Sequence, residues 1–316
     1  MFNPQRILVA PLDWGLGHAS RCIPLIKQYV AEGHQVILAT YGNSAALLQN
    51  EFPELRSILL PGIEIRYPKN SGMKITMLKQ YFTIKKAIRS EHRLLQNIIE
   101  KEKIDRVISD NRYGLYSSKT HCTIITHQLF IRAGIFSGII NAINRSYLKK
   151  FDEVWVPDFE DEKNLSGALS HGKHRLKNVK YIGPLSRYQG QSGKMTEKKF
   201  DILILLSGPE PQRSLLEIEL ANKLKSTTNK IALIRGTLQE IENPFTSDTL
   251  TIPMANEKQL LELIRHSEHI ICRSGYSTIM DLHALGRTAE FIPTPGQTEQ
   301  VYLAQLHKPK IHQLSW

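Results

Sequence analysis

The fold of this chain is decided by residues 271–282, which read ICRSGYSTIMDL. An apolar run ends there at Arg-Ser-Gly, and a Ser/Thr pair then opens a segment with helical spacing. Glycine lets the backbone approach a ligand closely, and the first N–H groups of a helix form a cradle for phosphate. The stretch therefore predicts a strand, a ligand-binding loop and a helix, which is the repeating unit of an α/β fold.

The same alternation extends over the rest of the chain. Short apolar runs predict buried strands, and the amphipathic stretches between them predict helices, here at 21–31, 44–50 and 74–103. Strands that alternate with helices are typical of parallel sheets. The predicted strands are 6–10, 35–40, 58–60, 63–67, 106–109, 123–126, 153–156, 180–182, 201–206, 231–234, 249–252, 269–272 and 290–292.

The length of 316 residues is sufficient for two domains of ordinary size. Residues 186–199 are rich in glycine and polar side chains, and a new apolar strand begins directly after them. We therefore predict a first domain at 1–185, a linker at 186–199 and a second domain at 200–316.

Positive charge is concentrated in the first part of the chain. The net charge is +11, and residues 1–186 hold 26 Lys/Arg against 16 Asp/Glu, whereas residues 187–316 hold 15 against 14. Within 66–93, basic and apolar residues interleave and Glu91 is the one acid. Such a segment is either a core-packed helix with a solvated basic face or a surface that rests on an anionic membrane. No nucleic-acid-binding module is recognisable, so we expect no nucleic-acid partner.

Composition also bounds the location of the protein. The three cysteines are widely spaced and lack metal-type pairing, which is typical of reduced thiols. No apolar run reaches about 18 residues, and the first residues lack a signal-peptide pattern. We expect a cytoplasmic protein without a metal site or cofactor; a peripheral position on the inner face of the cell membrane stays open.

A glycine-rich loop, GLGHASRC, occupies residues 15–22. Gly15 and Gly17 let the loop pass close to a ligand, and Arg21 lies on the helix that follows. At the start of that helix the dipole lowers the pKa of His18, so a neutral imidazole can act as a general base. Asp13 is the second candidate base. The alternative is a loop histidine packed between the domains without a catalytic role.

Further polar residues follow two other predicted strands. They are Asp110, Asn111 and Arg112 after residues 106–109, and His127 after residues 123–126. The carboxyl ends of parallel strands lie at one edge of the sheet, so these side chains are expected near His18. We interpret them as acceptor-recognising residues, with loop capping as the alternative.

The motifs at 15–22 and 271–282, with FIPTPGQTEQ at 291–300, resemble GT-B glycosyltransferases, which have two facing Rossmann-like domains. They are similar to the family of the peptidoglycan N-acetylglucosaminyltransferase. The resemblance covers most of the chain, but residues 66–150 match only in pattern. The loop at 15–22 is also similar to that of the nucleotide-sugar hydrolases of pseudaminic acid synthesis.

The resemblance implies a donor site in the second domain. The nucleotide-binding residues would be Ser207, Gly208, Met254, Ser274, Gly275, Ser277, Thr278 and Asp281, and the sugar-binding residues Glu299 and Gln300. Two departures are visible. Pro209 and Pro211 remove backbone donors from the first loop, and Asp281 stands where the family usually carries glutamate.

The implied activity is metal-independent, inverting transfer of a sugar from a UDP-sugar to an acceptor. N-acetylglucosamine is one candidate sugar, and a lipid-linked molecule is one candidate acceptor. Two alternatives remain: a nucleotide-sugar hydrolase and a non-catalytic nucleotide-sugar-binding protein. The segment after 307 is shorter than the terminal strand and helix of such transferases, which suggests a second domain shortened at its end.

Overall fold

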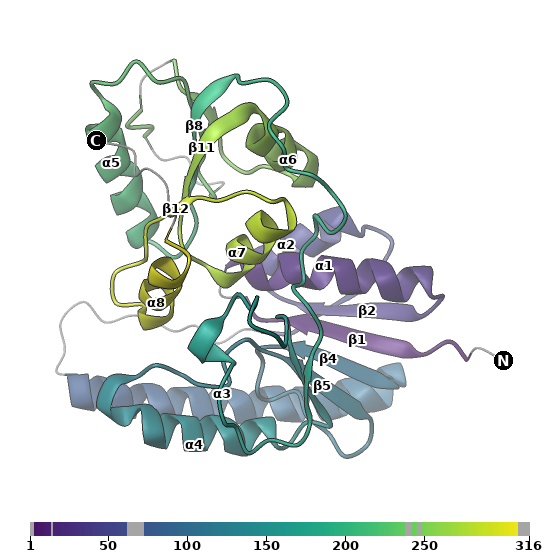
Figure 1. The fold of residues 1–316 in the computed structure, drawn as a ribbon. Coiled ribbons are helices and arrows are strands. Elements are labelled where there is room, and N and C mark those ends of the chain that lie inside the picture. The colour runs from purple at the N-terminus through teal and green to yellow at the C-terminus, as the bar shows by residue number, and fades with distance from the viewer. Residues whose placement is uncertain (1–2, 14, 62–72, 238–241, 246–247, 309–316) are drawn as a thin grey trace. The chain divides into compact units, whose positions relative to one another are not determined.

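The computed structural model describes residues 3–13, 15–61, 73–237, 242–245 and 248–308, with the side chains of 73–82 excepted. The chain forms two compact units, Met1–Leu185 and Ser186–Trp316 (Figure 1). Each unit is built on its own parallel sheet, of seven strands in the first and five in the second. The predicted α/β fold with two mainly parallel sheets is therefore confirmed.

The first sheet has the strand order β3-β2-β1-β4-β5-β6-β7, and every neighbouring pair is parallel. The chain runs outward from β1 to one edge and from β4 to the other, so the order reverses between these two central strands. The strands are β1 (Arg6–Pro11), β2 (Gln35–Thr40), β3 (Arg56–Leu59), β4 (Arg106–Asp110), β5 (His121–Ile125), β6 (Glu153–Val156) and β7 (Val179–Tyr181).

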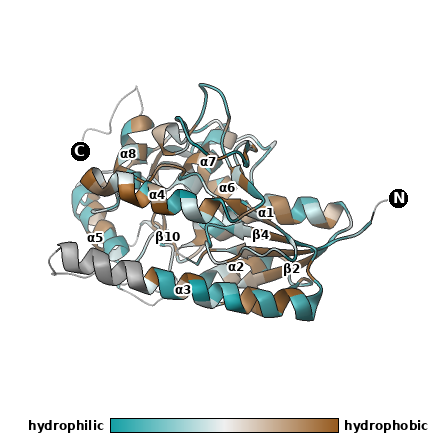
Figure 2. Cartoon of the chain, turned by 90° about the horizontal axis from the view of Figure 1, so that it is seen from below, coloured by the Kyte–Doolittle hydropathy of each residue, from teal (hydrophilic) through white to brown (hydrophobic). Residues whose placement is uncertain are grey.

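Helices cover both faces of the first sheet. On one face lie α1 (Leu16–Ala31) and α2 (Gly42–Glu51), and on the other α3 (Met73–Glu102) and α4 (Ser137–Leu148) (Figure 1). Leu95 of α3 and Leu148 of α4 belong to one buried cluster with sheet residues such as Ile124. Hydrophobic and hydrophilic residues alternate along α3 and α4 (Figure 2), as expected for helices that bury one side. Two short 3₁₀ helices, η1 (Gly134–Phe136) and η2 (Gly167–Leu169), complete this unit in the described part.

The second sheet has the order β10-β9-β8-β11-β12, again with parallel neighbours. Its strands are β8 (Phe200–Leu205), β9 (Ile231–Ile234), β10 (Leu250–Ile252), β11 (Ser267–Cys272) and β12 (Glu290–Phe291). Leu216 and Leu220 of α5 (Gln212–Leu224) pack on one face. Leu261 of α6 (Glu257–His266) and Leu282 of α7 (Tyr276–Ala284) pack on the other. The last helix of the described residues is α8 (Thr298–Leu306), and the order of strands reverses between β8 and β11.

Some element predictions were wrong or lie outside the described residues. The first helix begins at Leu16, five residues earlier than predicted, because Gly15 turns the chain with a φ of 103° directly before it. Helix α4 was not predicted, since exposed Ile135 and Ile139 obscure the helical period of its segment. The predicted strand at 63–67 and the last eight residues, 309–316, lie outside the described residues.

Residues 186–199, which we predicted as a linker, pack on the second unit. The N–H of Gly193 donates to the carbonyl of Leu285 (3.0 Å), and the N–H of Lys199 donates to that of His266 (2.9 Å). The Arg287 guanidinium donates to the Gly193 carbonyl at 3.3 Å. The segment therefore belongs to the surface of the second unit. Among the described residues, no helix combines the length and the apolar character needed to cross a membrane.

Candidate functional site

Each unit has one place where the strand order reverses, and open α/β sheets bind ligands there, beyond the carboxyl ends of the strands. In the first unit this point lies between β1 and β4, where His18 and Asp110 are found. In the second unit it lies between β8 and β11, where Ser207 and Gly275 follow the two strands. The topology thus provides two candidate subsites, one in each unit.

The first subsite is centred on the Asp110 carboxylate at the end of β4. Asp110 is fully buried, and its oxygens accept hydrogen bonds from the Arg21 guanidinium, through Nε at 2.5 Å and also through Nη2. His18 Nδ1 lies 3.0 Å from Oδ1 of the same carboxylate. Arg21 is itself only 2% exposed, so the charges of this pair are balanced inside the protein.

The contact with Asp110 determines how His18 can act. An ionised carboxylate only accepts hydrogen bonds, so Nδ1 must carry the proton and donate it. Nε2 is then left with a lone pair that can accept a proton. Arg21 Nη2 lies 3.0 Å from Nδ1 because both donors converge on Oδ1. The side chain of His18 is 17% exposed, so its ring is held firmly yet open to a ligand.

Electrostatics keep the His18 ring neutral and the Asp110 carboxylate ionised. Burial lowers the pKa of His18 below its ordinary value of 6.5, and the Arg21 charge lowers it further, although Asp110 opposes both. Burial by itself would raise the pKa of Asp110, but Arg21 and His18 hold that pKa well below its usual range. At neutral pH the cluster therefore contains a neutral imidazole, a carboxylate and a guanidinium, the state that a general base requires.

Two other side chains complete the cluster. His127, which follows β5, places Nδ1 at 3.4 Å from Arg21 Nη1 and is 6% exposed. Cys22 donates from Sγ to Asp110 at 3.6 Å, and burial with the nearby carboxylate raises the pKa of its thiol well above the ordinary value. Cys22 is thus a neutral packing partner. We did not single it out from the sequence, although it follows Arg21 in the same motif.

The remaining predicted residues of the first unit, Asp13, Arg112 and Asn111, have different surroundings. Asp13 accepts a hydrogen bond from the N–H of Ser44 at 3.0 Å, in the first turn of α2, and its role as a second base stays a prediction. Arg112 is 1% exposed and pairs with the buried Glu91 (2.9 Å), which ties the β4–β5 connection to α3. This ion pair gives Arg112 a structural role. Asn111 is half-buried with a φ of 56°, and its role stays a prediction.

The second subsite is the start of α7. Gly275 is the N-cap residue, and the positions of Ser277 and Thr278 in the first turn are half-exposed. A Cβ added to Gly275 would meet only Thr278 Oγ1, at 4.0 Å, so the space above this helix end is open. The N-terminus of a helix attracts anions through its dipole and its first N–H groups. The loop after β8 is exposed at Ser207 and Gly208, and a Cβ on Gly208 would meet Thr294 Oγ1 at 3.9 Å.

Three of the side chains in and around the predicted donor site brace loops. The Arg273 guanidinium donates to the carbonyls of Ile292, Pro293 and Gln212. Ser274 is fully buried and donates from Oγ to the backbone carbonyl of Gln300 at 2.8 Å. The side chain of Gln300 accepts from the N–H of Thr294 at 2.8 Å. These bonds join the connections after β8, β11 and β12 into one rigid support for the start of α7.

Asp281 has partners that the sequence did not reveal. Its Oδ1 accepts a hydrogen bond from Ser186 Oγ at 2.7 Å, and its Oδ2 lies 3.3 Å from Arg187 Nε. Burial raises the pKa of Asp281, and Arg187 opposes this. The carboxylate therefore attaches residues 186–187 to α7. Its predicted contact with a ribose stays a prediction, as do those of half-buried Met254 and Glu299 with the base and sugar.

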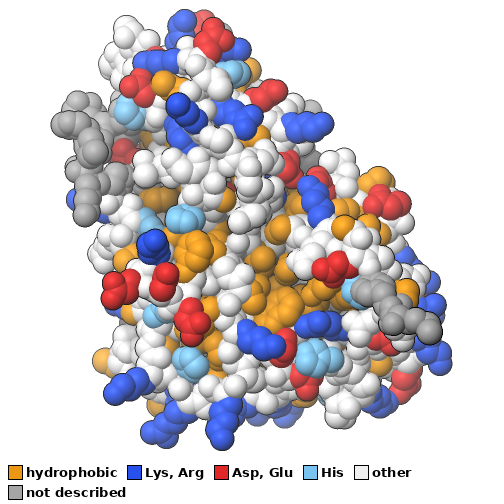
Figure 3. All heavy atoms as spheres, turned by 45° about the vertical axis from the view of Figure 1, so that its right-hand side comes forward, with side chains coloured by type: hydrophobic (Ala, Val, Ile, Leu, Met, Phe, Trp, Pro, Cys, Tyr) orange, Lys and Arg blue, Asp and Glu red, His pale blue; other side chains and the backbone are white. Residues whose placement is uncertain are grey.

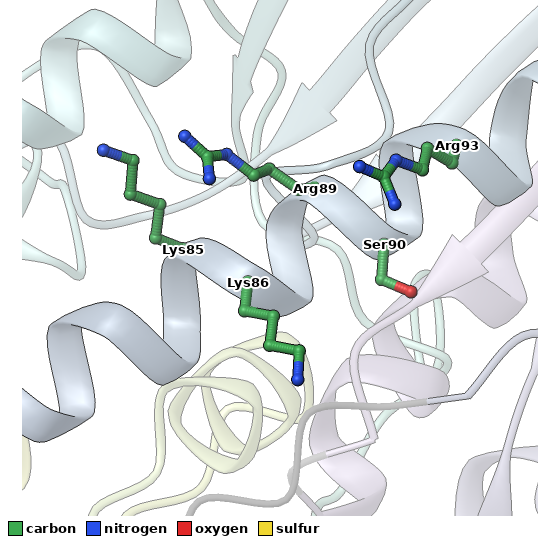
Figure 4. A pocket seen from close by; sticks show the side chains of 5 residues that line it. All are labelled: Lys85, Lys86, Arg89, Ser90 and Arg93. Atoms are coloured by element: carbon green, nitrogen blue, oxygen red, sulfur yellow. The ribbon is translucent and has the colours of Figure 1, made fainter.

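A basic hollow of about 460 Å³ lies along α3. It is lined by Lys85, Lys86, Arg89, Ser90 and Arg93, all of which project from this helix (Figure 4). Lys85 and Arg89 point to one side, and Lys86 and Ser90 point to the other. On the face shown in Figure 3, Lys and Arg side chains are widespread and are interspersed with Asp and Glu side chains. The part of the predicted basic segment before residue 83 has no described side chains.

Two units of this kind, each a parallel sheet flanked by helices, form the architecture of the GT-B glycosyltransferases. The structure of the calicheamicin glycosyltransferase CalG4 has this fold: it superposes with a TM-score of 0.65 at 10% sequence identity, over 96% of this chain and 84% of that one. Residues 5–310 match the family model described as "Glycosyl transferase family 1", and the chain belongs to that family. It is a glycosyltransferase.

Relatives with curated names agree with this assignment. An uncharacterized glycosyltransferase of Methanosarcina mazei is 30% identical over 63% of this chain and 56% of its own length. A Haemophilus ducreyi protein is 22% identical over 91% of this chain and 78% of its own length. That protein is named a UDP-N-acetylglucosamine--N-acetylmuramyl-(pentapeptide) pyrophosphoryl-undecaprenol N-acetylglucosamine transferase. The suspected resemblance is therefore confirmed at the level of fold and enzyme class.

Proposed function

We propose that this glycosyltransferase moves a sugar from a UDP-sugar to an acceptor hydroxyl, with His18 as the general base. The observation that carries the proposal is the hydrogen bond of His18 Nδ1 to Asp110 at the switch point of the first unit. It fixes the tautomer in which Nε2 accepts a proton. The named activity of the Haemophilus ducreyi relative supports UDP-N-acetylglucosamine as the first donor to test.

The reaction follows from this assignment. Nε2 of His18 takes the proton of the acceptor hydroxyl, and the acceptor oxygen forms a bond to the anomeric carbon of the donor sugar. The bond from that carbon to the oxygen of the diphosphate breaks, and UDP leaves with the electron pair. The buried Asp110 carboxylate stabilises the imidazolium that forms. A single displacement inverts the configuration of the anomeric carbon.

The leaving diphosphate needs a partner for its negative charge. We assign this role to the backbone N–H groups at the start of α7, where Gly275 allows close approach. The helix dipole adds a partial positive charge at the same place. We therefore propose that the reaction proceeds without a metal ion.

A substitution at Gly275 tests the donor site. Gly275 has a φ of −73°, which alanine adopts without strain, and an added Cβ has room in the free protein. Gly275→Ala is therefore expected to fold normally but to weaken UDP binding about tenfold or more. The added methyl group would hold the diphosphate away from the first N–H groups of α7, and one hydrogen bond to a charged group contributes about 1.5–3 kcal/mol. Titration calorimetry with UDP measures the change in Kd.

Gly138→Ala is the matched control. It lies in α4, and an added Cβ meets nothing within 4 Å. The control variant should bind UDP like the wild type. Equal Kd values for Gly275→Ala and the wild type would remove the start of α7 from the donor site.

The pH dependence of the reaction follows from the lowered pKa of His18. Activity requires the neutral ring, and burial together with Arg21 holds the pKa of that ring below 6.5. The acid limb of kcat/KM should therefore have its midpoint below pH 6.5, with no further rise from this group above it. A pH–rate profile measured with UDP-sugar and an accepted acceptor decides this. A midpoint at higher pH would mean that His18 is not the group that titrates.

We further propose that the acceptor is linked to a lipid and is met at an anionic membrane surface. The basic side chains on α3 support this, since Lys86, Arg89 and Arg93 are exposed along the helix. Each Lys or Arg near an anionic surface contributes about 1 kcal/mol to binding. The pyrophosphoryl-undecaprenol in the name of the Haemophilus ducreyi relative is an acceptor of this chemical class.

A further inference from the structure

The outer face of η1 and α4 carries solvent-exposed apolar side chains. Ile135 is 92% exposed and Ile139 67%, and Ala142 continues the same side of the helix as an exposed residue. We call these three residues the apolar α4 face. Single exposed apolar side chains are common, but neighbouring large ones usually mark a contact surface. This face is accordingly a candidate contact surface.

The scaffold under this face is rigid. Asn141 accepts a hydrogen bond from the N–H of Ile131 at 2.6 Å, and Asn144 donates to the carbonyl of Gln128 at 3.0 Å. The hydroxyl of Ser137 accepts from the N–H of Ala133 at 2.9 Å. These side chains tie both ends of the preceding loop to α4. These hydrogen bonds therefore hold the backbone that carries the exposed isoleucines in place.

The segment that carries the apolar α4 face has basic but no acidic residues. No Asp or Glu occurs in the sequence between Asp110 and Asp152. In the same interval Arg132, Lys149 and Lys150 are exposed. An acidic protein partner or an anionic lipid surface fits this sign, whereas a second copy of this basic face does not. The combination of exposed isoleucine with flanking Lys and Arg is the composition of helices that lie in a membrane interface.

The apolar α4 face also belongs to the edge of the sheet where the base lies. His127, in contact with Arg21, begins the loop that leads to Ile135. They are eight positions apart in the sequence, so the chain can span at most about 28 Å between their Cα atoms. A bilayer in contact with the apolar α4 face would thus lie close to His18. A lipid-linked acceptor could then keep its tail in that bilayer while its reactive end meets His18.

We infer that the apolar α4 face docks on an anionic bilayer, with Ile135 and Ile139 entering the interfacial region. Arg132, Lys149 and Lys150 meet the acidic headgroups around them. This docking differs from a contact through the basic side chains on α3 alone, because it adds an apolar contact, which salt does not screen. The inference rests on the proposed function in one respect: the docking serves the reaction because the acceptor is borne by the membrane.

Vesicle flotation tests the inference with the full chain. Vesicles are an equal mixture of phosphatidylglycerol and phosphatidylcholine, compared with phosphatidylcholine alone. The wild type should bind the anionic vesicles, and high salt should weaken this binding without abolishing it. The double variant Ile135→Glu, Ile139→Glu should lower the fraction bound about tenfold or more, since it replaces buried apolar area with charge in the interface.

A matched control separates this effect from a general loss of apolar surface. Leu215 and Ile218 on α5 are 53% and 49% exposed, and the variant Leu215→Glu, Ile218→Glu should bind vesicles like the wild type. Circular dichroism and Tm should be unchanged in both double variants. Equal vesicle binding by the α4 variant and the wild type would overturn the inference, as would absence of wild-type binding.

An environment-sensitive probe distinguishes the other occupants. Ile139→Trp should show a blue shift in its difference fluorescence when anionic vesicles are added. A blue shift on adding UDP alone, or on raising the protein concentration alone, would instead mean that the face is covered within the protein or by a second copy. Both outcomes overturn the inference. UDP binding measured on the same samples shows independently whether the proposed donor function holds.

Discussion

Replacing His18 by alanine is expected to lower kcat by about 10²–10⁴, which is the usual contribution of a positioned general base. The Kd for UDP should stay close to that of the wild type, because the proposed donor residues lie in the second unit and His18 in the first. The measurement is steady-state turnover of a UDP-sugar together with calorimetric titration of UDP. The two readouts separate loss of the base from loss of the fold.

His121→Ala is the matched control for this variant. His121 is 44% exposed and begins β5, at the amino edge of the same sheet, whereas His18 lies at the carboxyl edge. Removing it should leave turnover unchanged. Turnover by His18→Ala at the wild-type rate would contradict the proposed mechanism, whatever happened to the control.

The same assay separates transfer from hydrolysis. A transferase consumes the UDP-sugar only when an acceptor is present, whereas a hydrolase releases free sugar without one. If free sugar appears at the full rate with no acceptor, the water-using alternative replaces the proposed function. His18 would then act on water, and the geometry of its hydrogen bond to Asp110 would serve that reaction equally well.

The sequence predicted the parts of this structure that depend on local pattern. Buried parallel strands read as apolar runs because helices cover both faces of the sheet, so β2, β6 and β9 have the predicted bounds. Residue 110 was expected near residue 18 because both follow strands at the carboxyl edge. The first helix was predicted to begin at residue 21, because the glycines at 15 and 17 favoured a longer loop. It begins at Leu16.

The contacts that organise the site could not be predicted in the same way. Arg21 and Asp110 are 89 residues apart, and nothing in their spacing shows that the guanidinium meets the carboxylate. Asp281 is held by Ser186 and Arg187, which lie in a segment that composition marks only as a linker. Asp13 has the residue type of a base but binds the start of α2. Pairing of side chains between distant segments depends on packing, which periodicity does not encode.

Replacing Arg21 by methionine should lower the free energy of unfolding by about 3–5 kcal/mol at neutral pH, because it leaves the buried Asp110 carboxylate without its cation. This loss of unfolding free energy should change with pH in a defined direction. In the wild type the depressed pKa of Asp110 gives stability that is present above the unfolded pKa and is lost as the pH falls through the folded pKa. Without Arg21, burial raises that pKa above its unfolded value, so the ionised group destabilises the variant. The deficit should therefore be largest near pH 7 and shrink towards pH 4, as urea unfolding at several pH values would show.

Arg112→Met is the matched control, because it removes the cation of a second buried ion pair in the same unit, that with Glu91. It should also lower the stability, but it leaves the surroundings of His18 intact. Arg21 lowers the pKa of His18 whereas Asp110 raises it, so Arg21→Met should move the acid limb of kcat/KM to higher pH. Arg112→Met should not move it. If both variants lose stability and neither shifts the acid limb, Arg21 supports only the fold; a shift in Arg21→Met alone establishes it as the residue that keeps the base neutral.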